Sequence, residues 1–228
     1  MPEKQFRLPN NNDRVAILGR NGSGKSVMAA WLMSEADIDR KPWIIIDYKG
    51  EEIFDKIRKQ ERDAITDLEP TAPIPKRPGL YRVEPIPGED DAAITQMLWR
   101  IWEKQRVGIY FDEGHLVPNS DALKANLVTG RSRQIPIIML SQRPVWVPRE
   151  VFSESNHHIV FDLSHEEDRK TVGTFASPDG KAVPRIKEFH SIWNNVRQNK
   201  QYPMLPAPHA DQSVQRIVER APRHFRWY

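Results

Sequence analysis

The octapeptide GRNGSGKS at residues 19–26 has the residue types and spacing of a phosphate-binding loop, G-x-x-x-x-G-K-[ST]. Its glycines allow a tight turn in which backbone N–H groups face a phosphate chain, and the following helix N-terminus adds positive potential. An apolar run, RVAIL, precedes the loop and a helical pattern follows it, as the motif requires. The alternative is a glycine-rich turn with an exposed lysine. The context favours a nucleoside triphosphate site.

The residues of this loop have expected roles in binding ATP. The Lys25 ammonium is expected to reach the β- and γ-phosphates, and the Ser26 hydroxyl is expected to coordinate Mg²⁺. The predicted nucleotide-binding residues are Asn21, Gly22, Ser23, Gly24, Lys25, Ser26 and Val27.

An acidic pair ends a second apolar run, IYFDEGH at residues 109–115. This pattern fits a Walker B strand, in which Asp112 holds Mg²⁺ and Glu113 acts as general base toward the attacking water. The alternative is a solvated acidic turn after a strand, and the phosphate-binding loop elsewhere in the chain favours the catalytic interpretation. A glutamate beside the aspartate indicates hydrolysis rather than phosphate transfer by a kinase.

A third apolar run lies inside TGRSRQIPIIMLSQRP, residues 129–144. If this strand lies between the phosphate-loop strand and the Walker B strand, its end faces the γ-phosphate, where Gln142 would sense phosphate or orient water. The alternative is an ordinary residue that caps a loop. Arg131 and Arg133 precede the strand, at its opposite end, so we expect them to reach a neighbouring subunit's nucleotide or to form surface salt bridges. An arginine supplied in trans would require an oligomer.

The rest of the chain alternates strand and helix patterns, which predicts an α/β domain with a mostly parallel central sheet flanked by helices. Such sheets bind ligands at the carboxyl ends of their strands. We expect a single domain over residues 1–200, with an irregular proline-rich excursion at 68–88 that holds one short strand at Leu80–Val83. An edge strand is expected at 186–193. Residues 201–228 are expected to form a proline-rich, basic and aromatic C-terminal arm.

Composition limits the function classes. The chain has 228 residues, a formal net charge of +3 and no cysteine, which excludes disulfides, thiolate zinc sites and thiol catalysis. No apolar segment approaches the roughly 20 residues that cross a bilayer, and the N-terminus lacks a signal-peptide core. We therefore expect a cytoplasmic protein with no integral membrane segment.

Several blocks of sequence resemble the FtsK/HerA superfamily of ring-forming DNA translocases. They are RSRQIPIIMLSQRP, the following SNHHIVFDLSHEEDRKTV, and IIIDYKGEE at 44–52, which resembles a second strand ending D-x-K-x-x-E. With the phosphate-binding loop, these blocks occur in the superfamily's order over residues 14–175. The chain is most similar to the genome-packaging ATPases of tectivirus-like, membrane-containing double-stranded DNA phages. The membrane anchor and winged-helix domain of FtsK and the N-terminal barrel of HerA are not visible.

This resemblance implies a P-loop NTPase of the additional-strand, catalytic-glutamate type that uses ATP and Mg²⁺. It implies that Lys25 and Ser26 bind nucleotide and metal, that Asp112 binds the metal and that Glu113 is the base. Gln142 would be the γ-phosphate sensor. Arg131 would be the finger that acts in trans, with Arg133 the second choice.

We accordingly expect an ATP-driven translocase of double-stranded DNA that packages a viral genome. It would act as a homo-oligomeric ring, a hexamer or pentamer, associated with the virion through capsid or vertex proteins. Candidate DNA-contacting segments are the 68–88 excursion, with Lys76 and Arg77, and the loop after Glu113. The alternatives are a phage assembly, secretion or conjugation ATPase, and a nucleotide-binding switch without motor activity.

Overall fold

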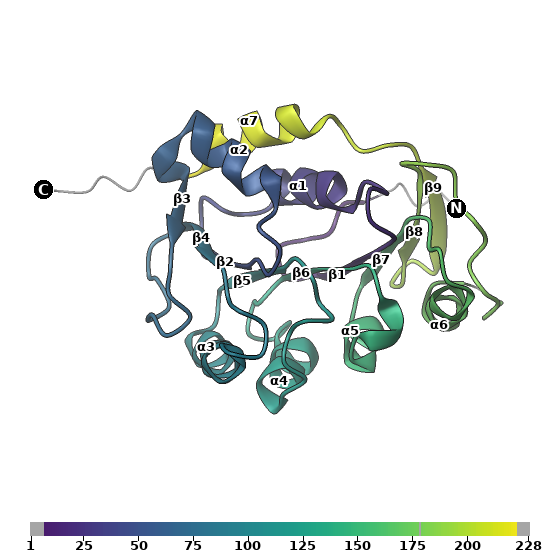
Figure 1. Cartoon of the computed structure of the whole chain (residues 1–228), viewed down its shortest axis with the longest axis horizontal. Coiled ribbons are helices and arrows are strands. Elements are labelled where there is room, and N and C mark those ends of the chain that lie inside the picture. Colours follow the sequence, from purple (N-terminus) through teal and green to yellow (C-terminus); the bar gives the residue numbers. More distant parts are fainter. Residues whose placement is uncertain (1–6, 178, 223–228) are drawn as a thin grey trace, which may run out of the picture.

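A computed structural model describes residues 7–177 and 179–222 (Figure 1). Their strands form one nine-stranded sheet in the order β3-β4-β2-β5-β6-β1-β7-β8-β9. The strands are β1 Arg14–Leu18, β2 Pro42–Ile46, β3 Ile65–Asp67, β4 Gly79–Val83, β5 Gly108–Phe111, β6 Ile137–Ser141, β7 His157–Val160, β8 Ser191–Asn195 and β9 Lys200–Met204. The first seven strands run parallel, whereas β8 and β9 are antiparallel additions at one side. The mostly parallel α/β sheet predicted from the sequence is confirmed.

Helices cover both faces of this sheet. They are α1 Lys25–Glu35, α2 Glu52–Gln60, α3 Asp91–Lys104, α4 Asp121–Thr129, α5 Arg149–Ser153, α6 Glu166–Ala176 and α7 Ala210–Arg220, with short 3-10 turns at Arg62–Ala64 and Pro144–Trp146. Helices α1, α2 and α7 lie on one face, and α3, α4 and α5 lie on the other (Figure 1).

The continuous apolar runs in the sequence are explained by the helices that cover both faces of the sheet. A parallel strand covered on both faces buries every side chain, so it does not alternate apolar and polar residues. In β1, Ala16 and Leu18 belong to the core under α3 and α4, while Val15 and Ile17 belong to the core under α1 and α2. The strand thus holds the phosphate-binding loop rigidly at its carboxyl end.

The C-terminal third departs from expectation. The edge strand predicted at residues 186–193 is wrong in two respects. The strand in this region, β8, begins only at Ser191, and the outermost strand on this side of the sheet is β9. Residues 201–222 of the expected arm contribute most of β9 and all of α7. This helix buries Val214 and Ile217, and Arg220 Nη2 donates to the carbonyl of Ala36, 2.7 Å away, after α1. The basic and aromatic end of the arm, 223–228, lies outside the described residues.

Among the described residues, none of the helices is long and apolar enough to cross a membrane.

Candidate functional site

Four loops that carry the predicted site residues leave adjacent strands at the same edge of the sheet. They follow β1, β6, β5 and β2, which are neighbours in the order β2-β5-β6-β1. The 137–141 strand, β6, therefore lies between the phosphate-loop strand and the strand that ends at Asp112, which is the condition on which the role predicted for Gln142 depends. The carboxyl edge of a parallel sheet is where this class of fold binds ligands.

The phosphate-binding loop has the backbone that its glycines permit. Gly22 and Gly24 adopt φ angles of 70° and 104°, in the left-handed region, and α1 begins at Lys25. The Lys25 side chain is buried over the loop, where its Nζ donates to the carbonyl of Arg20 at 3.1 Å. Burial lowers the pKa of Lys25, and the carboxylates of Glu113 and Asp112 act in the opposite direction. The loop thus places a buried ammonium near the Walker B acids.

Each of the two predicted Walker B acids is buried with one oxygen that has no partner among the described residues. Asp112 and Glu113 are 2% and 4% exposed, and Asp112 Oδ2 and Glu113 Oε2 have no hydrogen-bond partner among the described residues. Burial, followed by the charges of Glu51 and Glu113, raises the pKa of Asp112 to about 8. A buried carboxylate without a counterion is unfavourable, and a divalent cation relieves that cost. The donor set therefore fits Mg²⁺, a cation that prefers oxygen ligands.

Strand β6 joins these two loops through its last carbonyls. The carbonyl of Ser141 accepts from Gly19 N at 3.2 Å, and the carbonyl of Leu140 accepts from Gly114 N at 2.7 Å. Gln142 is the next residue and is half-buried. It leaves the sheet between the phosphate-binding loop and Glu113, which is the position that its predicted sensing role needs.

One neighbour of Glu113 was not identified from the sequence. His115 Nδ1 lies 3.3 Å from Glu113 Oε2, although the pair lacks hydrogen-bond geometry. The His115 ring also packs against Trp146, with centroids 5.8 Å apart, and Trp146 is 58% exposed. His115 therefore links the predicted base to an exposed aromatic surface. The sequence signal was only its place two residues after the glutamate.

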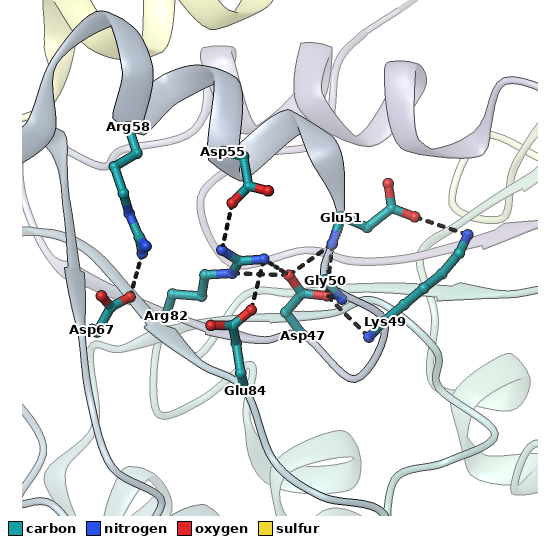
Figure 2. A network of polar contacts seen from close by, with 9 residues as sticks. All are labelled: Asp47, Lys49, Gly50, Glu51, Asp55, Arg58, Asp67, Arg82 and Glu84. Carbon is teal, nitrogen blue, oxygen red and sulfur yellow. Dashed lines mark hydrogen bonds and ion pairs between the residues drawn. The ribbon is translucent and has the colours of Figure 1, made fainter.

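The loop after β2 is held by a buried carboxylate (Figure 2). Asp47 accepts from the backbone N–H groups of Lys49, Gly50 and Glu51 at 3.2, 2.9 and 3.0 Å. Arg82 of β4 donates to Asp47 Oδ2 through Nε at 2.9 Å and Nη2 at 2.6 Å. Asp47 thus supports the loop and is itself neutralised by an arginine from the neighbouring strand.

This support brings Glu51, and not Glu52, to the site. The D-x-K-x-x-E resemblance points to Glu52, whose side chain is 79% exposed and pairs with Lys56 on α2. The Glu51 side chain is only 11% exposed, pairs with Lys49 at 3.2 Å (Figure 2), and contributes to the raised pKa of Asp112. Because Glu51 and Glu52 are adjacent and of the same type, the sequence alone does not indicate which of them lies at the site.

Arg131 and Arg133 precede β6, so they lie at the amino ends of the strands, opposite the carboxyl ends that carry the nucleotide site, as expected. The Arg133 guanidinium stacks over the Trp102 ring at 3.5 Å and donates to the Trp102 carbonyl at 3.2 Å. Arg131 is exposed. Neither arginine forms a salt bridge with a carboxylate in the part of the chain that the structure describes. The role of either residue in trans stays a prediction.

The two candidate DNA-contacting segments lie at opposite ends of the strands, one at the amino ends and one at the carboxyl ends. Lys76 and Arg77 precede the start of β4, at the same edge as Arg131, and Arg77 is exposed. The loop after Glu113 lies at the nucleotide edge. The 68–78 part of the excursion is irregular as expected, and the short strand predicted at its end is β4.

Comparisons with known proteins identify one similar sequence and several similar folds. No family model matches the sequence. The chain is 42% identical to the DNA packaging ATPase P9 of Enterobacteria phage PRD1 over 221 residues, which are 93% of this chain and 95% of that protein.

Solved structures share the fold at low identity. The genome packaging NTPase B204 of Sulfolobus turreted icosahedral virus 2, in complex with ATP-gammaS, matches with a TM-score of 0.68 and 16% identity, covering 87% of this chain and 99% of that one. EssC ATPases 2 and 3 from Geobacillus thermodenitrificans match with a TM-score of 0.61 and 15% identity, covering 92% of this chain and 43% of that one.

Proposed function

Since the chain belongs to the family of the PRD1 DNA packaging ATPase P9, we propose that it is the ATPase that drives double-stranded DNA into a viral capsid. One structural observation carries the catalytic part of this proposal. The loops bearing Lys25, Gln142, Asp112 and Glu51 leave four adjacent strands at one edge, and Asp112 and Glu113 each have one buried oxygen without a partner among the described residues.

Mg²⁺ is proposed as the metal of this site, held by the Ser26 hydroxyl and the Asp112 carboxylate. When bound it supplies positive charge to the β- and γ-phosphate oxygens. The chain's own part is to bind the phosphates with the loop amides and the Lys25 ammonium. The burial of Lys25 excludes water from this contact and strengthens it.

Glu113 is proposed as the general base and Gln142 as the residue that orients the attacking water. Gly114 N donates to the carbonyl of Leu140, so the loop that carries Glu113 is bonded to β6, the strand that leads into Gln142. Both residues therefore lie at the same end of the sheet as the phosphate-binding loop. Glu113 carries no arginine or lysine partner among the described residues, which keeps it available for the proton of the water.

A neighbouring subunit is proposed to complete each site in a homo-oligomeric ring, a hexamer or pentamer. Arg131 is the better finger because it is exposed and unpaired with carboxylates in the described structure, whereas Arg133 is already stacked on Trp102. DNA would pass through the ring along basic loops, and capsid or vertex proteins would anchor the ring to the particle. The proposed place of action is the host cytoplasm and the virion vertex.

The test is ATP hydrolysis with and without double-stranded DNA. Wild-type turnover should rise with DNA, and Glu113→Gln and Arg131→Ala should each lose it, with nucleotide still bound by Glu113→Gln. Arg62→Ala, which changes an exposed arginine on the turn after α2, is the matched control and should hydrolyse like wild type.

Mixing the two inactive variants tests the ring directly. Glu113→Gln subunits still carry Arg131, so they should activate adjacent Arg131→Ala subunits and restore activity at about a quarter of the interfaces in a random mixture. If the rate of hydrolysis does not change with DNA of any length, the proposal that the protein translocates DNA is wrong. If the mixtures are as inactive as either variant alone, Arg131 does not act in trans on a neighbouring subunit.

A further inference from the structure

A cavity of about 380 Å³ adjoins the phosphate-binding loop. This volume lies within the usual range of small-molecule sites. Gly24 of the loop and Val27 of α1 form one wall, so the cavity continues directly from the place where the phosphates are expected. The other described lining residues are Lys56, Phe189, Pro206, Ala207, His209, Ala210 and Asp211.

Phe189 presents an aromatic ring to this cavity at a conformational cost. Its φ is 58°, in the left-handed region that a bulky side chain seldom occupies, and the residue remains 48% exposed. Strained backbone of this kind persists only where surrounding contacts impose it. The ring also lies against the phosphate-binding loop, because a Cβ built on Gly24 would lie 3.6 Å from Phe189 Cδ1.

One carboxylate fixes the segment that carries Phe189 to the phosphate-binding loop. Asp162 accepts from Arg185 Nε and Nη2, both at 2.7 Å, and from Ile186 N at 3.3 Å. It also accepts from Nε of the loop residue Arg20 at 3.1 Å. The aromatic wall and the phosphate-binding loop therefore share one anchor, and they keep their relative position.

The part of the lining that precedes α7 is also fixed in place. Pro206 and Ala207 lead into α7, which packs on α1 through Val214 and Ile217. Arg220, at the end of α7, donates to the carbonyl of Ala36 at 2.7 Å. The apolar wall before α7 is thus fixed to the helix that begins in the phosphate-binding loop.

We propose that this cavity is the nucleobase subsite, and that the adenine of ATP stacks on Phe189. The proposal rests on the proposed function, because it needs a triphosphate on the phosphate-binding loop. Aromatic side chains bind the faces of bases in a sequence-tolerant way, so Phe189 supplies affinity for the base and takes no part in hydrolysis. Phe189 is therefore a positioning residue that acts on nucleotide binding.

Equilibrium binding separates the base from the phosphates. Dissociation constants are measured for ATP and for inorganic tripolyphosphate, which has no base, with wild type, Phe189→Ala, Phe189→Tyr and Leu205→Ala. Leu205 is a matched control because it is a nearby exposed apolar residue, 74% exposed, outside the cavity lining. Phe189→Ala should weaken ATP binding at least about fivefold, the equivalent of one lost stacking contact.

The same variant should bind tripolyphosphate like wild type, and Phe189→Tyr should bind both ligands like wild type. In turnover, Phe189→Ala should raise KM for ATP and leave kcat unchanged. Equal weakening of ATP and tripolyphosphate, or no weakening of either, would overturn the subsite. A wild-type protein that binds neither ligand would instead overturn the proposed function, so the two failures are distinguishable.

Discussion

Replacing Arg82 by methionine tests the support of the loop after β2. The side chains of Arg82 and Asp47 are 2% and 0% exposed, and the pair is joined by two hydrogen bonds. Removing the arginine leaves a buried carboxylate without its cation, which costs about 3–5 kcal/mol in unfolding free energy. Asp47 keeps the N–H donors of the loop residues 49–51, so we expect about 3 kcal/mol, the lower end of that range.

The exposed partners of Arg82 add little to this loss. Asp55 and Glu84 each lie 3.0 Å from the guanidinium (Figure 2), but their side chains are about half exposed, so both carboxylates can return to water. For a chain of this size, a loss of about 3 kcal/mol corresponds to a Tm lower by roughly 6–12 °C. Denaturant unfolding followed by tryptophan fluorescence measures the free energy.

Two further variants make the result specific to the buried charge. Arg58→Met removes a surface ion pair with Asp67, shown beside the buried pair in Figure 2, and should cost no more than about 1 kcal/mol. Adding Asp47→Asn to Arg82→Met removes the stranded charge and should recover about 1–3 kcal/mol. If Arg82→Met costs no more than Arg58→Met, or Asp47→Asn recovers nothing, the buried pair does not support the loop.

Three other perturbations have expected outcomes. Gly114→Ala places a Cβ 2.6 Å from Met139 Sδ inside the core, so it should cost about 1–3 kcal/mol in unfolding free energy and lower kcat; unchanged stability would contradict the close contact. The Arg185 guanidinium lowers the pKa of Asp162 to about 2, so Asp162 stabilises the fold above about pH 4 and loses this effect as pH falls toward 2. The stability deficit of Asp162→Asn should therefore shrink over that range in unfolding curves, and a constant deficit would be inconsistent with the pairing. Glu51→Gln should raise the Mg²⁺ concentration for half-maximal ATPase by roughly two- to fivefold, because one partly screened charge is lost; an unchanged requirement would exclude Glu51 from the metal's environment.

The sequence could predict the parts of this fold whose signals are local. An apolar run followed by GRNGSGKS, or by Asp112 and Glu113, strongly favours a central parallel strand, since a strand buried on both faces must be apolar throughout. The role predicted for Gln142 depends on β6 lying between β1 and β5, and the sheet order meets that condition. These elements hold most of the proposed catalytic groups.

Other elements depend on partners distant in the chain. Strand β4 was expected only as a short strand in a proline-rich excursion, because Arg82 interrupts its apolar pattern. That arginine is paired with Asp47, which lies 35 residues earlier. Helix α7 follows three prolines and is polar on its outer face, and its burial against α1 gives Val214 and Ile217 a place to pack.

The acids at the nucleotide edge fall into two groups that residue type alone does not separate. Asp47 and Asp162 follow β2 and β7, and each binds an arginine from another part of the chain and holds its own loop. Asp112 and Glu113 follow β5, between those two, and retain buried oxygens that have no partner among the described residues.

This division has an electrostatic consequence. Arg82 and Arg185 are neutralised by the two outer aspartates, so the chain's own arginines at these anchors do not compete for the central acids. The raised pKa of Asp112, against the lowered pKa of Asp162, reports that difference in pairing. The charge of the central acids is therefore available to the metal ion and the attacking water proposed above. The guanidinium proposed to act at the γ-phosphate is that of Arg131 from a neighbouring subunit, because Arg131 lies at the opposite ends of the strands in its own subunit.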